Sequence, residues 1–178
     1  LARHRGSLSG AMPGGQPSQK AFETALALAL ARLDPTRPVV VEAESSKVGN
    51  CRLPPELWKA MVAAPRVAIS APLAARAEYL VRAYGDLIAE EGRLARVIGQ
   101  LQPMHAAEVI AGWQALVAAG EYRALAAELM AQHYDPRYGK HRDRMATNWR
   151  VVEAGPLDPV ALRAVADRVA AEGAALCP

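Results

Sequence analysis

The sequence predicts an α/β fold in which a parallel sheet carries a helical insertion. Three short runs, at residues 39–41, 66–69 and 150–152, are apolar apart from an arginine at the start of the second and third, and they contain the β-branched residues typical of buried strands. Between the second and third runs, apolar residues recur at three- and four-residue spacing, as in amphipathic helices. The 178 residues are 52% hydrophobic but only 5% aromatic, which favours helices packed through small side chains.

The first 17 residues are rich in Gly, Ser and Pro, so we expect a loop that is ordered mainly by what it binds. Ser18 is placed to cap a helix that runs to about Leu33. A polar stretch, residues 42–46, directly follows the first apolar run. We therefore expect a buried strand that ends in acidic residues.

A short helix is expected from Pro55 to about Ala64, because proline is tolerated in the first turn of a helix. This helix separates the first apolar run from the second. Strand, helix and strand with short connections are typical of a parallel sheet with a right-handed crossover.

The helical insertion is expected from residue 73 to about residue 147. Glycine and proline residues divide it into four helices, at residues 73–84, 86–101, 105–119 and 121–133. The chain then returns to the sheet at the third apolar run. A last helix is expected from residue 160 to about 173, with Asp158 as its N-cap.

The net charge of +3 is concentrated in two segments. Residues 1–20 contain three basic and no acidic residues, and residues 133–150 contain five basic and two acidic residues. This distribution suits a phosphate-bearing ligand or nucleic acid, although a solvated basic loop is the alternative.

The two cysteines, Cys51 and Cys177, match no metal-ligand spacing and indicate neither a zinc site nor a disulfide framework. A reducing, cytoplasmic location fits this pattern. No apolar run has the roughly 18 residues that a membrane span needs, so no membrane association is expected.

Glu42 follows the first apolar run, with Glu44 and Ser45 just behind it. In nucleotide-binding α/β folds, ligands bind at the carboxyl ends of the strands, where an acid can hold Mg²⁺. The pattern resembles a Walker B element and favours a partial P-loop NTPase-like sheet, with Glu42 as the candidate metal ligand. An exposed acidic turn is the other interpretation. The sequence contains no Gly-Lys-Ser/Thr loop to complete a P-loop.

Four stretches resemble the bacterial tRNA 2-selenouridine synthase family in order and spacing. They are residues 1–7 (LARHRGS), 16–23 (QPSQKAFE), 41–49 (VEAESSKVG) and 134–138 (YDPRY). Many family members have Glu-Asp-Glu-Ser-Arg where this chain has EAESS, so the middle acid and the arginine are absent here. The resemblance extends from residue 1 to about residue 169.

The resemblance implies an enzyme that converts wobble 2-thiouridine in tRNA to 2-selenouridine through a geranylated intermediate. Its co-substrates would be geranyl diphosphate and selenophosphate, with Mg²⁺ as a candidate cofactor and tRNA as the partner. Family members join an amino-terminal rhodanese-like domain, whose cysteine carries selenium, to a P-loop domain. On this basis residues 1–178 are expected to be a partial P-loop-type domain without the rhodanese domain or the Walker A loop, and inactive alone.

The resemblance and the residue chemistry together select three groups of site residues. Cationic and polar residues of the opening segment are expected to bind diphosphate or the tRNA backbone, because arginine binds phosphate bidentately: Arg3, His4, Arg5, Gly6, Ser7, Gln16, Ser18 and Gln19. The Walker B-like group is Glu42, Glu44 and Ser45. The tRNA-binding group interleaves basic residues with aromatic rings on which RNA bases can stack: Tyr134, Arg137, Tyr138, Lys140 and Arg142.

No catalytic residue is expected within this chain. Cys51 is expected to be an ordinary thiol, and His105 and His133 to be structural. Two other functions remain open: a P-loop small-molecule kinase that uses the same strand and acid, and a non-catalytic RNA-binding module whose acids are only structural.

Overall fold

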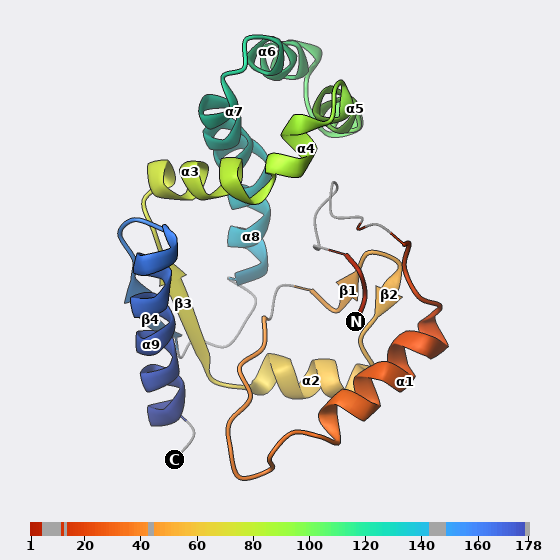
Figure 1. Cartoon of the computed structure of the whole chain (residues 1–178), viewed down its shortest axis with the longest axis vertical. Helices are drawn as coiled ribbons and strands as arrows, with labels where there is room; N and C mark the ends of the chain where they lie inside the picture. Colours follow the sequence, from red (N-terminus) through yellow and green to blue (C-terminus); the bar gives the residue numbers. More distant parts are fainter. Residues whose placement is uncertain (5–11, 13, 43–44, 143–148, 177–178) are drawn as a thin grey trace. The chain divides into compact units, whose positions relative to one another are not determined.

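The computed structural model describes residues 1–4, 12, 14–42, 45–142 and 149–176, apart from the side chains of residues 140–142. The described residues are mixed α/β and mostly helical, and they group into two compact units. The first unit is built mainly from Leu1–Arg66, and the second from Val67–Met145 and Arg150–Val169. Figure 1 labels the α-helices and β-strands of both units.

The first unit contains helices α1 (Gln19–Leu30) and α2 (Pro55–Ala63) and a small hairpin. The N-cap of α1 is Ser18, as the sequence predicts, because its hydroxyl accepts a hydrogen bond from the backbone N–H of Ala21 at 3.2 Å. The buried residues of this unit are Ala2, Phe22 and Cys51, and the partly buried residues packed against them are Leu26, Val48 and Leu53.

The hairpin of β1 (Lys47–Val48) and β2 (Cys51–Arg52) is a feature that the sequence analysis missed. The two strands are antiparallel, with Val48 opposite Cys51. Gly49 in the connecting turn has a φ of 62°, a conformation that glycine adopts without strain. The Gly-Asn pair at residues 49–50 is itself a recognised hairpin signal, so the sequence did contain the information.

Strands β3 (Arg66–Ser70) and β4 (Trp149–Glu153) form a two-stranded sheet, which belongs to the second unit apart from the first residue of each strand. Their first residues are neighbours, since the Arg66 guanidinium carbon lies 5.5 Å from the centre of the Trp149 ring. Their last residues are also neighbours, since the N–H of Ala154 donates to the carbonyl of Ser70 at 2.7 Å. The strands are therefore parallel. Both were expected from the apolar runs.

Helix α9 (Pro159–Leu176) begins where the sequence predicts. Asp158 Oδ1 accepts hydrogen bonds from the N–H groups of Val160 and Ala161, at 2.9 and 3.0 Å, and so caps the helix. From α9, Val165 packs against Val152 and Ala154 next to the sheet.

The remaining helices of the second unit occupy the predicted insertion (Figure 1). They are α3 (Leu73–Ala83), α4 (Gly85–Ala89), α5 (Arg93–Gly99), the 3₁₀ turn η1 (Gln102–Met104), α6 (Ala107–Ala118), α7 (Tyr122–Leu129), the π-helix η2 (Met130–Tyr134) and α8 (Asp135–Arg142). One cluster of their side chains is centred on the buried residues Ile98, Leu101, Ile110, Trp113 and Leu125. A second joins Ala77 of α3 to Ala126 and Met130.

Three expectations about these elements were wrong. Residues 39–41 form no strand, and their valines are 51%, 70% and 51% exposed. A strand needs a neighbour for its backbone hydrogen bonds, and no strand of the described residues pairs with this run. The helix expected at residues 86–101 is broken before Arg93, because Gly92 has a φ of 67°. The helix expected to end near residue 133 continues through η2 into α8.

Candidate functional site

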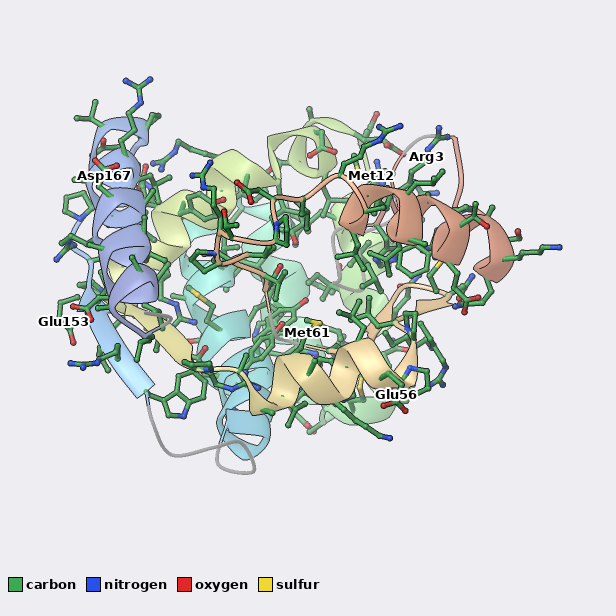
Figure 2. The ribbon with its side chains drawn as sticks, turned by 90° about the horizontal axis from the view of Figure 1, so that it is seen from below. Arg3, Met12, Glu56, Met61, Glu153 and Asp167 are labelled. Atoms are coloured by element: carbon green, nitrogen blue, oxygen red, sulfur yellow. The ribbon has the colours of Figure 1, made fainter. Side chains whose placement is uncertain are left out.

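The opening segment holds Arg3 in a defined backbone conformation. Ala2 is buried against Phe22, whereas the next side chain, Arg3, is exposed. Arg3 has a φ of 49°, which is uncommon for a residue with a side chain. Its carbonyl accepts a hydrogen bond from the N–H of Met12 at 3.3 Å. Figure 2 shows Arg3 and Met12 side by side next to α1.

Gly14 makes room for the guanidinium group of Arg3. Nη1 of Arg3 lies 2.8 Å from the point that a Cβ atom at position 14 would occupy, and Gly14 has a φ of 88°. Any other residue there would be strained, and the guanidinium group would have to move from its position. Gly15 follows with a φ of 70°. Neither glycine adds a side chain of its own to this part of the segment, which suits close approach of a phosphate group.

Gln16 ties this segment to the hairpin. Its Nε2 donates to the carbonyls of Ala2 and Val48, both at 3.0 Å, and its Oε1 accepts from the N–H of Asn50 at 2.7 Å. The amide is thus used within the protein, and it holds Arg3 in place through its neighbour Ala2. The structure therefore gives Gln16 a positioning contact.

Gln19 makes a second link of the same kind. Its side chain exchanges two hydrogen bonds with the backbone of Arg52, donating to the carbonyl at 2.8 Å and accepting from the N–H at 2.9 Å. Together with the Ser18 cap, these contacts fix the first turn of α1 against β2. The structure thus brings Arg3, Gln16, Ser18 and Gln19 together in one region.

The acidic group is only partly described. Glu42 is exposed and lies in a segment without regular secondary structure, not at the end of a strand. Ser45 Oγ accepts a hydrogen bond from the N–H of Lys47 at 3.0 Å and thereby begins the hairpin. Among the residues that the structure describes, no cluster of three or more His, Cys, Asp or Glu side chains could hold a metal ion.

Some residues of the predicted site lie outside the described part of the chain. These are Arg5, Gly6, Ser7 and Glu44, together with the side chains of Lys140 and Arg142. His4 is described and is half-buried.

Tyr134, Arg137 and Tyr138 come together on η2 and α8. The centres of the two tyrosine rings are 6.3 Å apart and the ring planes differ by 18°, so the rings are stacked. Tyr138 is 41% exposed, and Tyr134 is half-buried. Arg137 is exposed, and its Nη2 lies 2.8 Å from Sδ of Met104. The helical spacing of the tyrosines was the sequence signal for this stack.

Two histidines, His105 and His133, form a hydrogen-bonded pair, and the His133 ring contacts the ring of Tyr134. Nε2 of His105 and Nδ1 of His133 are 2.8 Å apart, so one ring donates a hydrogen bond to the other. His133 is buried, and this burial lowers its pKa; the positive charge of Arg137 and the His105 ring lower it further. The sequence offered no signal for this pair, because 28 residues separate its members.

An ion pair attaches the first turn of α8 to α3. Nη1 and Nη2 of Arg76 bind the two carboxylate oxygens of Asp135 at 3.0 and 2.5 Å. This bidentate geometry fixes both distance and orientation. The pair therefore sets where the residues that follow Asp135 on α8 lie.

Comparison with known proteins identifies the family. Residues 1–108 match the family model described as the tRNA 2-selenouridine synthase AAA domain. A tRNA 2-selenouridine synthase from Alcanivorax borkumensis is 32% identical, in an alignment that covers 82% of this chain and 48% of that protein. The chain belongs to the tRNA 2-selenouridine synthase family.

Other tRNA 2-selenouridine synthases agree with this assignment. The protein from Verminephrobacter eiseniae is 31% identical over 89% of this chain and 51% of its own length. That from Hahella chejuensis is 45% identical over 47% of this chain and 23% of its own length. The chain thus spans about half the length of the curated tRNA 2-selenouridine synthases that it matches most extensively. No solved structure matches it.

The family match encloses the opening segment, Glu42 and Ser45, and it ends before Tyr134. Across the described ranges, no helix is long and apolar enough to span a membrane.

Proposed function

We propose that this chain is the part of a tRNA-modifying enzyme that binds tRNA and the diphosphate-bearing alkyl donor. The complete enzyme would convert wobble 2-thiouridine to 2-selenouridine. The observation that carries the proposal is family membership, which rests on the match of residues 1–108 and on relatives aligned to more than four fifths of the chain.

The proposed reaction has two steps. The sulfur of 2-thiouridine is first alkylated by geranyl diphosphate, which releases diphosphate. Selenium from selenophosphate then displaces the geranylated sulfur from C2, so that geranylthiol leaves, and water cleaves the P–Se bond to release phosphate. In this scheme the chain supplies binding groups, and Cys51 does not carry selenium, because it is 1% exposed within the core of the first unit.

We assign the diphosphate to the opening segment, where the guanidinium group of exposed Arg3 lies beside Gly14. His4, Arg5, Gly6 and Ser7 continue the same segment and complete the proposed binding loop. Gln16 holds Ala2, the neighbour of Arg3, against the hairpin, and Ser18 and Gln19 fix the first turn of α1, so these residues would support the site by positioning it. The site would lie in a P-loop-type domain.

The acidic residues take a secondary role in the proposal. Glu42, with Glu44 and Ser45, would approach Mg²⁺ bound to the diphosphate, because carboxylates are preferred ligands of this ion. Glu42 is exposed, which permits such contact. We propose that this group binds Mg²⁺ only when the diphosphate is bound as well.

A titration with geranyl diphosphate tests the assignment of the opening segment. Isothermal calorimetry on the 178-residue chain should show binding in the presence of Mg²⁺, and Arg3→Gln should weaken it about tenfold or more, because a charged hydrogen bond contributes about 1.5–3 kcal/mol. Arg32→Gln, which changes an exposed arginine just after α1, is the matched control and should bind normally. Equal binding by the wild type and Arg3→Gln would rule out this placement of the diphosphate.

A further inference from the structure

Aromatic rings form a continuous row from the core of the second unit to its surface. Buried Trp113 meets His105 edge-on at 4.8 Å, and His105 meets His133 at 5.1 Å between ring centres. His133 meets Tyr134 edge-on at 4.8 Å, and Tyr134 stacks on Tyr138. Each ring is thus supported by the ring before it, and the outermost ring is anchored to the core.

Tyr138 is the outermost of these five rings and the one most accessible to a ligand. It keeps 41% of its surface exposed although one side of the ring rests on Tyr134. Bidentate binding of Asp135 by Arg76 fixes the helix turn from which Tyr138 projects. A ring held in this way loses little conformational freedom when another flat group stacks on it.

The charges around Tyr138 favour an anionic partner. Arg137 is exposed next to it, and the carboxylate of Asp135 is already neutralised by Arg76. In sequence, Lys140 and Arg142 follow within α8. An aromatic ring beside cations is the arrangement by which proteins bind single-stranded nucleic acid, where bases stack on rings and cations meet phosphates.

We propose that Tyr138 stacks with an unpaired base in a loop of the tRNA, with Arg137 contacting the adjacent phosphate. This inference rests on the proposed function and deepens it. It names the ring that recognises a base and assigns Trp113, His105, His133 and Tyr134 to positioning that ring. Paired, double-helical RNA is not the expected ligand, because its bases are stacked on one another and cannot stack on a side chain.

The test measures binding of the 178-residue chain to two labelled RNAs by fluorescence anisotropy. One is a 17-nucleotide anticodon stem-loop, and the other is a duplex of equal length. Tyr138→Ala should weaken stem-loop binding about 5- to 150-fold, the range for loss of one stacked base, and should leave duplex binding unchanged. Tyr138→Phe keeps the ring and should bind like the wild type. Tyr79→Ala, at a 40% exposed tyrosine of α3, is the matched control and should also bind like the wild type.

A second measurement reports stacking directly and does not depend on the stability of a variant. The fluorescent base 2-aminopurine, placed in turn at each loop position of the stem-loop, should be quenched by the wild type at one or two positions. Tyr138→Phe should retain the quenching, and Tyr138→Ala should lose it.

The outcomes separate the two proposals. Failure of the wild type to bind either RNA would contradict the proposed function, and this inference with it. Wild-type binding with equal affinity for the Ala variant, or with no quenched position, would overturn this inference alone. A loss of duplex binding as large as the loss of stem-loop binding would also overturn it, because it would indicate a backbone contact.

Discussion

At the scale of single residues, the first unit depends on close contacts between small and amide side chains. Gly49 is the clearest example. Its φ of 62° favours glycine, and a Cβ atom there would lie 2.2 Å from Oε1 of Gln16. The same amide binds Ala2, next to Arg3, so a change at Gly49 would disturb the opening segment as well as the hairpin.

Gly49→Ala is therefore expected to lower the free energy of unfolding by about 1–3 kcal/mol, through backbone strain and displacement of Gln16. Gly112→Ala is the matched control, since Gly112 is exposed within α6 and a Cβ there meets nothing within 4 Å. The control should be neutral or more stable by about 0.5–1 kcal/mol, because alanine favours helix. Urea denaturation measures the free energy of unfolding of both variants. Equal changes in the two would contradict the proposed role of Gly49.

The buried His133 should make stability depend on pH. Its pKa is lowered in the folded protein, so between that value and the ordinary value of 6.5 the unfolded chain binds more protons. The stabilisation is fully present above pH 6.5 and is lost as the pH falls through the folded pKa. The wild type should therefore lose more stability than His133→Gln between pH 7.5 and 5, as measured by urea denaturation at each pH. Parallel pH profiles of the two proteins would refute this role of His133.

At the scale of elements, residues 39–41 present β-branched side chains without a strand beside them among the described residues. Such a run can pair with the same run of another molecule. Val40→Lys should therefore reduce the increase in light scattering with protein concentration, without changing the melting temperature. Val152→Lys is the contrasting variant, because Val152 is 4% exposed and lysine there should unfold the second unit. If the light scattering of Val40→Lys increases with protein concentration as steeply as that of the wild type, residues 39–41 are not the cause of association.

The ion pair between α3 and α8 should contribute a small but measurable coupling. The side chains of Arg76 and Asp135 are 34% and 41% exposed, so solvent screening limits the pair to about 0.5–1 kcal/mol. A double-mutant cycle with Arg76→Ala and Asp135→Ala measures this energy from urea denaturation. If the proposed orientation of α8 is right, Arg76→Ala should also weaken binding of the anticodon stem-loop, though less than Tyr138→Ala does. A coupling of zero would mean that the pair does not hold α8.

At the scale of the whole molecule, local features were predictable and distant contacts were not. The caps at Ser18 and Asp158 and the strands β3 and β4 depend on a few adjacent residues, so they could be predicted from the sequence. The strand expected at residues 39–41 was wrong, because its formation depends on a neighbour and not on its own composition. Contacts such as Gln16 with Asn50, or His105 with His133, join residues 34 and 28 positions apart and leave no local pattern.

The candidate site also combines local features that could be predicted from the sequence with distant contacts that could not. The basic opening segment and the tyrosine pair were visible in the sequence as composition and spacing. The room that Gly14 leaves for Arg3 and the row of rings that supports Tyr138 became visible only in three dimensions. Family membership, expected from four short stretches, is confirmed by the comparisons.

The most direct test of the central claim is selenium transfer by a chimera. The chain would replace the matching half of the Alcanivorax borkumensis relative, and the nucleosides of a 2-thiouridine tRNA would be analysed by mass spectrometry after incubation with geranyl diphosphate and selenophosphate. We predict that the chimera forms 2-selenouridine, that Arg3→Gln reduces its formation at least tenfold, and that the 178-residue chain alone forms none. Formation of 2-selenouridine by the chain alone, or full activity of the Arg3→Gln chimera, would contradict the account.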